Sequence, residues 1–337
     1  MTLKLILAFV IAFLVSVGVG ALLVPWLRKI KAGQSIREDG PTWHMSKSGT
    51  PTMGGLMFIA ACAVVCLTVG FQSMLRGDWG HIIVLVFALG FGSIGFLDDY
   101  EKLKKKQNLG LTAKSKFLLQ LLASLVFIYL LRLLGYVSTG LYVPFFNVTL
   151  HLSAPVYFIF AAFAIVATVN AVNLTDGVDG LATGTSIPVC LFFVACTFLW
   201  GEKYLSLGVF ASALLGGLMG FLVYNFNPAK VFMGDTGSLF LGGAVAGLAF
   251  TFDMPLIILI VGLLYVLEAL SDVIQVVYFK LSHGKRVFKM APFHHHLELG
   301  GWTGKKWTER QLFVLFTTVS LVCAVLGFLG IYGRFPY

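Results

Sequence analysis

The sequence predicts an all-α protein that crosses a membrane many times. Of its 337 residues, 58% are hydrophobic and only 12% are charged, with a mean hydropathy of +0.91. A soluble chain of this length could not bury so much apolar side chain. The apolar runs are continuous and about 20 residues long, as membrane-spanning helices are. They do not alternate over segments of about ten residues, which excludes a β-barrel.

Ten apolar segments are expected to be transmembrane helices. The first is too long for a signal peptide and lacks a small-residue cleavage site, so we expect an uncleaved span. We find no internal repeat and no linker, and residues 1–337 are therefore expected to form a single integral membrane domain. The five cysteines fall inside apolar segments and are interpreted as small buried hydrophobic residues. The expected spans cover residues 3–27, 53–75, 81–97, 115–135, 154–173, 181–200, 204–223, 236–252, 254–281 and 311–333.

The distribution of basic residues predicts how these spans are oriented. Most of the 24 lysine and arginine residues fall in the odd-numbered loops, which the positive-inside rule places in the cytoplasm, with both termini outside. The net charge of +9 is then a property of the cytoplasmic surface, and no nucleic-acid partner is expected. Between spans 4 and 5, residues 141–144 and 147–152 alternate well enough to predict a small external hairpin.

Two adjacent carboxylates, Asp98 and Asp99, end the third span, and a lysine-rich segment that includes Lys102 follows them. Carboxylates at a membrane boundary are costly unless they have a function there. Neighbouring residues on a helix point about 100° apart, so we expect two distinct roles for the pair. The alternative is a charged cap at the membrane boundary.

Two more polar motifs lie beside predicted cytoplasmic loops. Asn170, Asn173, Asp176 and Asp179 recur every three residues, which predicts either a polar ligand pocket or hydrogen bonds to a neighbouring helix. Asp235 falls near the expected N-terminus of the eighth span, where it could cap the helix or hold Mg²⁺ through hard oxygen ligands. If these motifs share one side of the bilayer, they can form a single anionic site.

The ninth span and the loop after it carry further candidates. Glu268, Asp272 and Gln275 share one helix face, and we expect a structural role for Glu268 and a functional one for Asp272. Three consecutive histidines at 294–296 make a poor tetrahedral metal site because neighbouring side chains diverge, so recognition of phosphate or sugar is the better interpretation. In the first loop, residues 47–55 could wrap phosphate oxygens or form an ordinary turn.

Five motifs, in this order along the chain, resemble those of the polyprenyl-phosphate N-acetylhexosamine-1-phosphate transferases. Within that group the sequence is similar to the phospho-N-acetylmuramoyl-pentapeptide transferase family. Each motif alone is weak, but five in order are specific. They lie at residues 48–55, 98–100, 173–177, 232–238 and 292–296.

The resemblance implies a reaction and a location. UDP-N-acetylmuramoyl-pentapeptide would donate phospho-N-acetylmuramoyl-pentapeptide to undecaprenyl phosphate, giving lipid I and UMP, with Mg²⁺ as cofactor. Two anionic phosphates would be brought together, which requires a divalent cation and lysines to neutralise them. The protein would lie in the bacterial cytoplasmic (inner) membrane among its lipids, with periplasmic termini and an active site facing the cytoplasm. Exposed apolar helix faces would permit a homodimer.

The resemblance also implies roles for single residues. Asp235 would be the main Mg²⁺ ligand, with Asp98 and Asp99 beside it. Asp98 would deprotonate or orient the polyprenyl phosphate and Asp99 would support the site; direct displacement and a covalent route both remain open. Phe232 would stack on uracil. The remaining substrate-binding set comprises Lys47, Thr52, Lys102, Lys114, Asn170, Asn173, Asp176, Asp179, Asn225, Asp272, Gln275, His294, His295 and His296.

Two rival functions are weighed against this one. A sister transferase that uses UDP-N-acetylglucosamine would share the chemistry, but the triple histidine and residues 49–55 favour the muramoyl-pentapeptide donor. An ion-coupled secondary transporter would also place carboxylates in membrane spans. Against a transporter stand the absence of repeats and the clustering of polar motifs at one face instead of the midplane.

Overall fold

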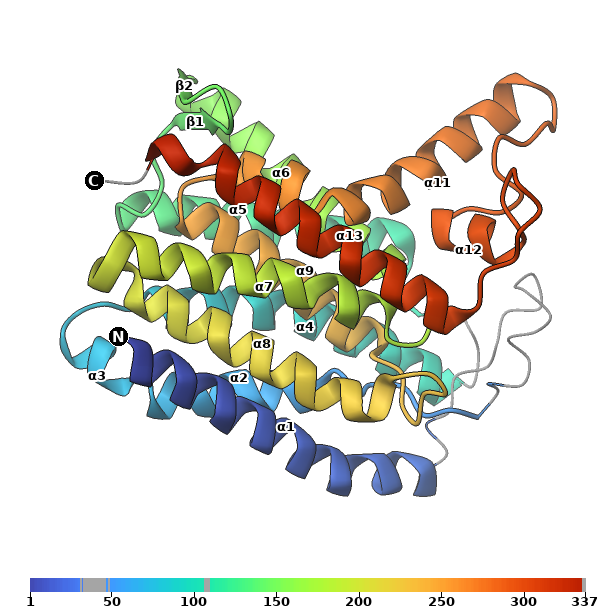
Figure 1. The fold of residues 1–337 in the computed structure, drawn as a ribbon, viewed down its shortest axis with the longest axis horizontal. Coiled ribbons are helices and arrows are strands. Elements are labelled where there is room, and N and C mark those ends of the chain that lie inside the picture. Colours follow the sequence, from blue (N-terminus) through green and yellow to red (C-terminus); the bar gives the residue numbers. More distant parts are fainter. Residues whose placement is uncertain (31, 33–46, 48, 106–109, 335–337) are drawn as a thin grey trace.

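The computed structural model describes residues 1–30, 32, 47, 49–105 and 110–334, and the chain is helical over most of that length (Figure 1). Among the described residues, nine helices are 18 residues or longer; eight of them form a bundle, and the C-terminal part of the ninth, α11, projects from it. In chain order the elements are α1 (Thr2–Lys29), α2 (Leu56–Thr68), α3 (Phe71–Leu75), α4 (Gly80–Lys105), α5 (Ala113–Leu133), β1 (Gly140–Val143), β2 (Val148–His151), α6 (Ala154–Thr175), α7 (Leu181–Trp200), η2 (Gly201–Tyr204), α8 (Leu205–Asn225), α9 (Gly234–Thr251), η3 (Pro255–Ile257), α10 (Ile258–Val261), α11 (Leu263–Leu281), α12 (Phe293–Glu298), α13 (Glu309–Gly330) and η4 (Tyr332–Arg334).

The lengths and hydropathy of these helices are those of a polytopic membrane protein. Among the described residues, 6 helical segments are long and apolar enough to cross a bilayer, or 7 if the bent pair 255–261 and 263–281 counts as one span. One of them, Leu181–Asn225, contains both α7 and α8, which pack against each other after the chain reverses at Gly201 with φ 77°. The count of ten spans remains a prediction.

Two expected spans differ from continuous helices. Residues 53–75 are divided near Gly70 into α2 and α3. Residues 254–281 are broken at Gly262, where the axis bends by 84°. A Cβ on Gly262 would crowd the carbonyl oxygen of Ile258, so a residue without a side chain allows the break. Beyond it α11 projects away from the bundle (Figure 1).

Helix α9 is the centre of the bundle. Every residue from Thr236 to Thr251 is buried, and α4 and α6 pack along its length. Close approach depends on glycine: a Cβ on Gly242 would meet the backbone of Val169 in α6. Small residues at such contacts let helix backbones pack tightly inside a membrane. The N-terminus of α9 is therefore held in a fixed place.

The outer surface is apolar, as a lipid-facing surface must be. Leu22 is 78% exposed, Phe163 72% and Leu281 76%. In a soluble protein such large exposed apolar side chains would be a liability. The five cysteines are free and buried, as expected from the sequence.

A two-stranded antiparallel sheet lies between α5 and α6, in the region where a hairpin is expected. Strand β1 pairs with β2 in the register Gly140↔His151. The backbone N–H of Phe145 in its turn donates to the carbonyl of Gly330, 2.7 Å away, at the end of α13. Figure 1 shows the N-terminus and the C-terminal end of α13 at the same end of the bundle as this hairpin, whereas α12 and the N-terminus of α9 lie toward the other end.

Candidate active site

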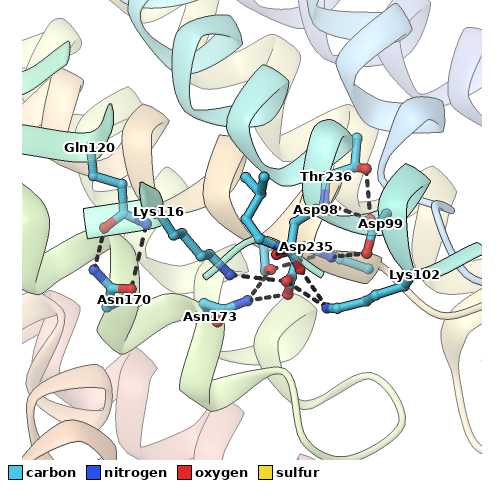
Figure 2. Close-up of polar contacts among 12 residues, drawn as sticks. Asp98, Asp99, Lys102, Lys116, Gln120, Asn170, Asn173, Asp235 and Thr236 are labelled. Atoms are coloured by element: carbon cyan, nitrogen blue, oxygen red, sulfur yellow. Dashed lines mark hydrogen bonds and ion pairs between the residues drawn. The ribbon is translucent and has the colours of Figure 1, made fainter. Parts of the chain in front are cut away.

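Three carboxylates meet where α4 ends and α9 begins. Asp98 and Asp99 lie near the C-terminus of α4, and Asp235 is in the first turn of α9 (Figure 2). One oxygen from each lies within 4.8 Å of the others. A Cβ on Gly95, one turn before Asp99, would collide with the backbone of Asp235, so the glycine permits this approach. We call Asp98, Asp99 and Asp235, with the lysines that contact them, the carboxylate cluster.

The two neighbouring aspartates point in different directions, as expected. Asp99 accepts hydrogen bonds from the backbone N–H of Thr236 at 2.9 Å and from its hydroxyl at 2.7 Å, and also from the N–H of Asp235 at 3.2 Å. Asp98 instead accepts from the N–H of Leu111 at 2.8 Å. Asp99 thus caps α9 from a different helix, because the first N–H groups of a helix have no partner within it. Asp235 does not serve as that cap.

Two lysines converge on a single oxygen of Asp235. Lys102 Nζ and Lys116 Nζ each lie 2.9 Å from Asp235 Oδ2, and Lys102 also lies 2.6 Å from Asp98 Oδ2. Asn173 Nδ2 donates to the other oxygen of Asp235 at 2.8 Å (Figure 2). The carboxylates of the cluster are therefore surrounded by lysine and asparagine side chains, which could equally donate to the oxygens of a phosphate.

The lysine that α5 contributes differs from the expected one. Lys114 is exposed at the start of the helix, and the structure brings Lys116 to the cluster instead. A signal for Lys116 exists in the sequence, because Gln120 and Ser124 follow it at intervals of four and are both buried. Polar residues with that spacing share one helix face.

The stripe of polar residues on α6 divides into separate roles. Asn170 Nδ2 donates to Gln120 Oε1 of α5 at 2.7 Å, a hydrogen bond between helices of the kind considered above as the alternative. Asn173 points into the carboxylate cluster, and Asp176 follows the last turn of α6. Burial raises the pKa of Asp176 well above its usual range, and the charges of Asp235 and Asp99 add to this rise. A cation would relieve the repulsion.

A second ionic group joins four segments of the chain, and we call it the loop staple: Lys47, Asp179, Asn227 and Glu309. Lys47 Nζ lies 2.7 Å from Asp179 Oδ1 and 2.6 Å from Glu309 Oε2. Asn227 Nδ2 donates to both carboxylates, at 3.2 and 3.1 Å. The N–H of Ala229 completes it by donating to Asp179 at 2.9 Å. Lys47 and Asp179 are both among the site residues expected from the sequence, whereas Glu309 is not.

Three further expected site residues, Asn225, Phe232 and Thr52, lie in or beside the segment that leads into α9. The amide of Asn225 donates to the carbonyl of Val231 at 3.0 Å. The N–H of Phe232 donates to the carbonyl of Pro51 at 2.8 Å, and Thr52 is 6% exposed beside it. These contacts hold residues 51–55 against the chain that leads into α9.

The three histidines lie on a short helix, α12, where a loop is expected, and their Nδ1 atoms have different partners. His294 Nδ1 is 3.0 Å from Glu268 Oε2, and His295 Nδ1 is 2.6 Å from Glu298 Oε2. His296 Nδ1 accepts from the N–H of Lys289 at 3.1 Å. The three Nδ1 atoms therefore contact three different groups.

The side chains of α11 nearer its C-terminus organise the following loop. Gln275 Oε1 accepts from the N–H groups of Val287 and Phe288 at 3.1 and 3.0 Å. Asp272 is half-buried on the same helix. Gln275 therefore shapes the approach to α12, while the structure gives Asp272 no place in the carboxylate cluster.

Known proteins match the chain over nearly all of its length, and two family models match parts of it. A model of Glycosyl transferase family 4 matches residues 81–253, and the phospho-N-acetylmuramoyl-pentapeptide-transferase signature 1 matches residues 47–59. A phospho-N-acetylmuramoyl-pentapeptide-transferase of Thermoanaerobacter sp. is 47% identical over 328 residues, which cover 96% of this chain and 98% of the relative. The chain belongs to the phospho-N-acetylmuramoyl-pentapeptide-transferase family. The resemblance seen in the five motifs is thereby confirmed.

Other phospho-N-acetylmuramoyl-pentapeptide-transferases give the same result. The protein of Heliobacterium modesticaldum is 47% identical over 332 residues, covering 97% of both chains. That of Carboxydothermus hydrogenoformans is 45% identical over 335 residues, covering 97% of this chain and 99% of its own. The similarity thus includes α11, α12 and α13 as well as the region that contains the carboxylate cluster.

Proposed function

We propose that this protein transfers phospho-N-acetylmuramoyl-pentapeptide from its UDP derivative to undecaprenyl phosphate, giving lipid I and UMP in the first membrane step of peptidoglycan synthesis. One observation carries the proposal. Three carboxylates and two lysines converge at one end of a bundle of apolar helices, in a chain that is similar over its whole length to transferases named for this donor.

The donor set of the carboxylate cluster fits Mg²⁺. Its three acidic groups, Asp98, Asp99 and Asp235, offer only carboxylate oxygens, which are the ligands that this ion prefers. Asp235 and Asp98 would be the principal ligands, because Asp99 already accepts three hydrogen bonds from the start of α9. A bound Mg²⁺ would neutralise phosphate charge and polarise the phosphoryl group.

The protein's own groups would then position the two phosphates. Lys102 and Lys116 are paired with Asp235 and can exchange that carboxylate for phosphate oxygens. Asp98 would orient the undecaprenyl phosphate or accept its proton. A direct in-line displacement is simpler than a covalent route, because a phosphate is already a competent nucleophile.

The two substrates would approach from different directions. The nucleotide would bind near Asn173, Asp176 and Phe232, with His294–His296 close to its sugar. The apolar side of α11, where Val273 is 57% and Val277 50% exposed, suits a prenyl chain. We place the carboxylate cluster at the cytoplasmic face, the termini and the β1–β2 hairpin in the periplasm, and all of residues 1–337 in one domain of ten spans, with a homodimer permitted by the exposed apolar faces.

Release of UMP from purified protein in detergent tests this function. UDP-N-acetylmuramoyl-pentapeptide and undecaprenyl phosphate together should give UMP and a lipid-linked product, and only with Mg²⁺ present. Turnover with UDP-N-acetylglucosamine in place of the muramoyl donor would favour the sister transferase. No turnover without an ion gradient would favour a transporter, so either result contradicts the proposal.

A further inference from the structure

Glu268 and His294 form a fully buried pair outside the carboxylate cluster. Both side chains are 0% exposed, and Glu268 Oε2 lies 3.0 Å from His294 Nδ1. The same oxygen lies 3.4 Å from the backbone N–H of His294. Since a carboxylate only accepts hydrogen bonds, Nδ1 carries the proton in this contact. Glu268 therefore fixes both the tautomer and the orientation of the histidine ring.

The other nitrogen of the ring is directed at the turn that follows Asp176. A Cβ placed on Gly177 would collide with His294 Nε2, so the ring tip rests against the backbone of that turn. Within the part of the chain that the structure describes, neither His294 Nε2 nor Glu268 Oε1 has a hydrogen-bond partner. Leaving buried polar atoms unpaired is costly, which indicates that Nε2 has a partner during function.

We infer that Glu268 is a positioning residue: it orients His294 so that Nε2 hydrogen-bonds the sugar-phosphate part of the donor substrate at the Asp176–Gly177 turn. This inference rests on the proposed function for the identity of the donor. It assigns Glu268, expected from the sequence to have only a structural role, an effect on donor binding. It also explains why residue 177 is glycine, because any side chain there would displace the ring.

The position of Glu268 supports an effect on binding of the donor and not on binding of the lipid substrate. Glu268 lies on α11, but its side chain is directed into the protein and not toward the apolar outer face. The turn that His294 touches connects α6 with α7 and carries Asp176 and Asp179. Asp176 belongs to the region proposed for the nucleotide.

A double-mutant cycle on the full-length protein in detergent tests the inference. The variants are Glu268→Gln, His294→Ala and the double variant. The quantities measured are KM and kcat for each substrate and Kd for UDP-N-acetylmuramoyl-pentapeptide without lipid. Glu268→Gln should raise KM and Kd for the donor about tenfold, because an uncharged amide accepts from Nδ1–H more weakly than a carboxylate does, with KM for undecaprenyl phosphate unchanged. In the His294→Ala background, Glu268→Gln should cost no more than about twofold further.

Gly177→Ala is a second probe that leaves the buried pair chemically intact. It should raise KM for the donor by a similar factor and should also lose its effect when His294 is alanine. Glu101→Gln is the matched control, because Glu101 pairs only with Lys105 at 2.6 Å on the surface of α4 among the described residues. Its kinetic constants should stay within about twofold of the wild type.

The outcomes separate the inference from the function on which it rests. A wild type that binds the donor but releases no UMP contradicts the proposed transfer, while the Kd comparison still tests Glu268. If Glu268→Gln binds and turns over like the wild type, the inference is wrong. An equal loss from Glu268→Gln in both backgrounds also overturns it, since general destabilisation would be independent of His294.

Discussion

The carboxylate cluster and the loop staple are both built from acidic residues and lysine, yet one aspartate of each, Asp235 and Asp179, contacts a different kind of donor. Asp235 accepts from the side chains of Lys102, Lys116 and Asn173. In the staple, Asp179 and Glu309 also accept from the amide of Asn227, and the N–H of Ala229 donates to Asp179. Lysine side chains can swing to another anion, whereas backbone N–H groups cannot. The comparison teaches that the cluster is suited to exchange ligands and the staple to hold loops together.

Metal removal should produce the largest difference between the two groups. We expect chelation by EDTA to reduce UMP release to background and added Mg²⁺ to restore it, because the three carboxylates otherwise repel the substrate phosphates. The loop staple needs no metal, so the thermal midpoint should fall by less than about 2 °C. Full turnover in the presence of EDTA would contradict the metal assignment.

Neutralising one acid of the carboxylate cluster should have the second-largest effect on turnover. Asp235→Asn and Asp98→Asn should each lower kcat at least about 100-fold, as loss of a charge-stabilising group commonly does. Asp99→Asn should lose as much, because an amide cannot accept all the bonds that Asp99 makes to the start of α9. Well-folded Asp235→Asn with near-normal UMP release would be incompatible with the proposed role.

The two lysines of α5 offer a matched pair. Lys116→Met should lower kcat/KM about tenfold, since Lys116 contacts Asp235 directly and a charge-assisted contact is lost. Lys114→Met, two residues away and exposed, should have an effect at least fivefold smaller. The reverse order would contradict the role of Lys116 in the carboxylate cluster.

Weakening the loop staple should have the smallest effect on turnover and a measurable effect on thermal stability. Glu309→Gln removes a charge beside Lys47 but keeps an acceptor. The thermal midpoint should fall by roughly 2–4 °C, which corresponds to about 1 kcal/mol in a chain of moderate size. At saturating substrate, kcat should change less than about threefold. Loss of turnover without loss of stability would erase the distinction between the two groups.

Much of the site was predictable from local patterns. The divergence of Asp98 and Asp99 follows from helix geometry, and the polar motifs of α4, α6 and α9 lie together as proposed from their common side. The contact of Lys116 with Asp235 was predictable in principle, because the interval between Lys116 and Gln120 places both on one face. Local pattern thus identifies which helix face is polar once the helix start is known.

Other features depend on contacts between distant parts of the chain. Glu309 meets Lys47 across an interval of 262 residues, and no local signal marks such a partner. The cap of α9 comes from Asp99 of α4 and not from its own first residues, which requires knowing how α4 and α9 pack. The break at Gly262 resembles any glycine in an apolar run, so its 84° bend could not be read from sequence.

The complete burial of α9 has a consequence for how the molecule moves. Amide protons in a helix enclosed by neighbours exchange with solvent only when a large part of the structure opens. Those in the C-terminal half of α11, which projects away from the bundle, need only local fraying. Hydrogen–deuterium exchange should therefore be slowest around Leu241 and fast around Tyr278, so that any adjustment to incoming lipid falls on α11 while the backbone that carries Asp235 stays still.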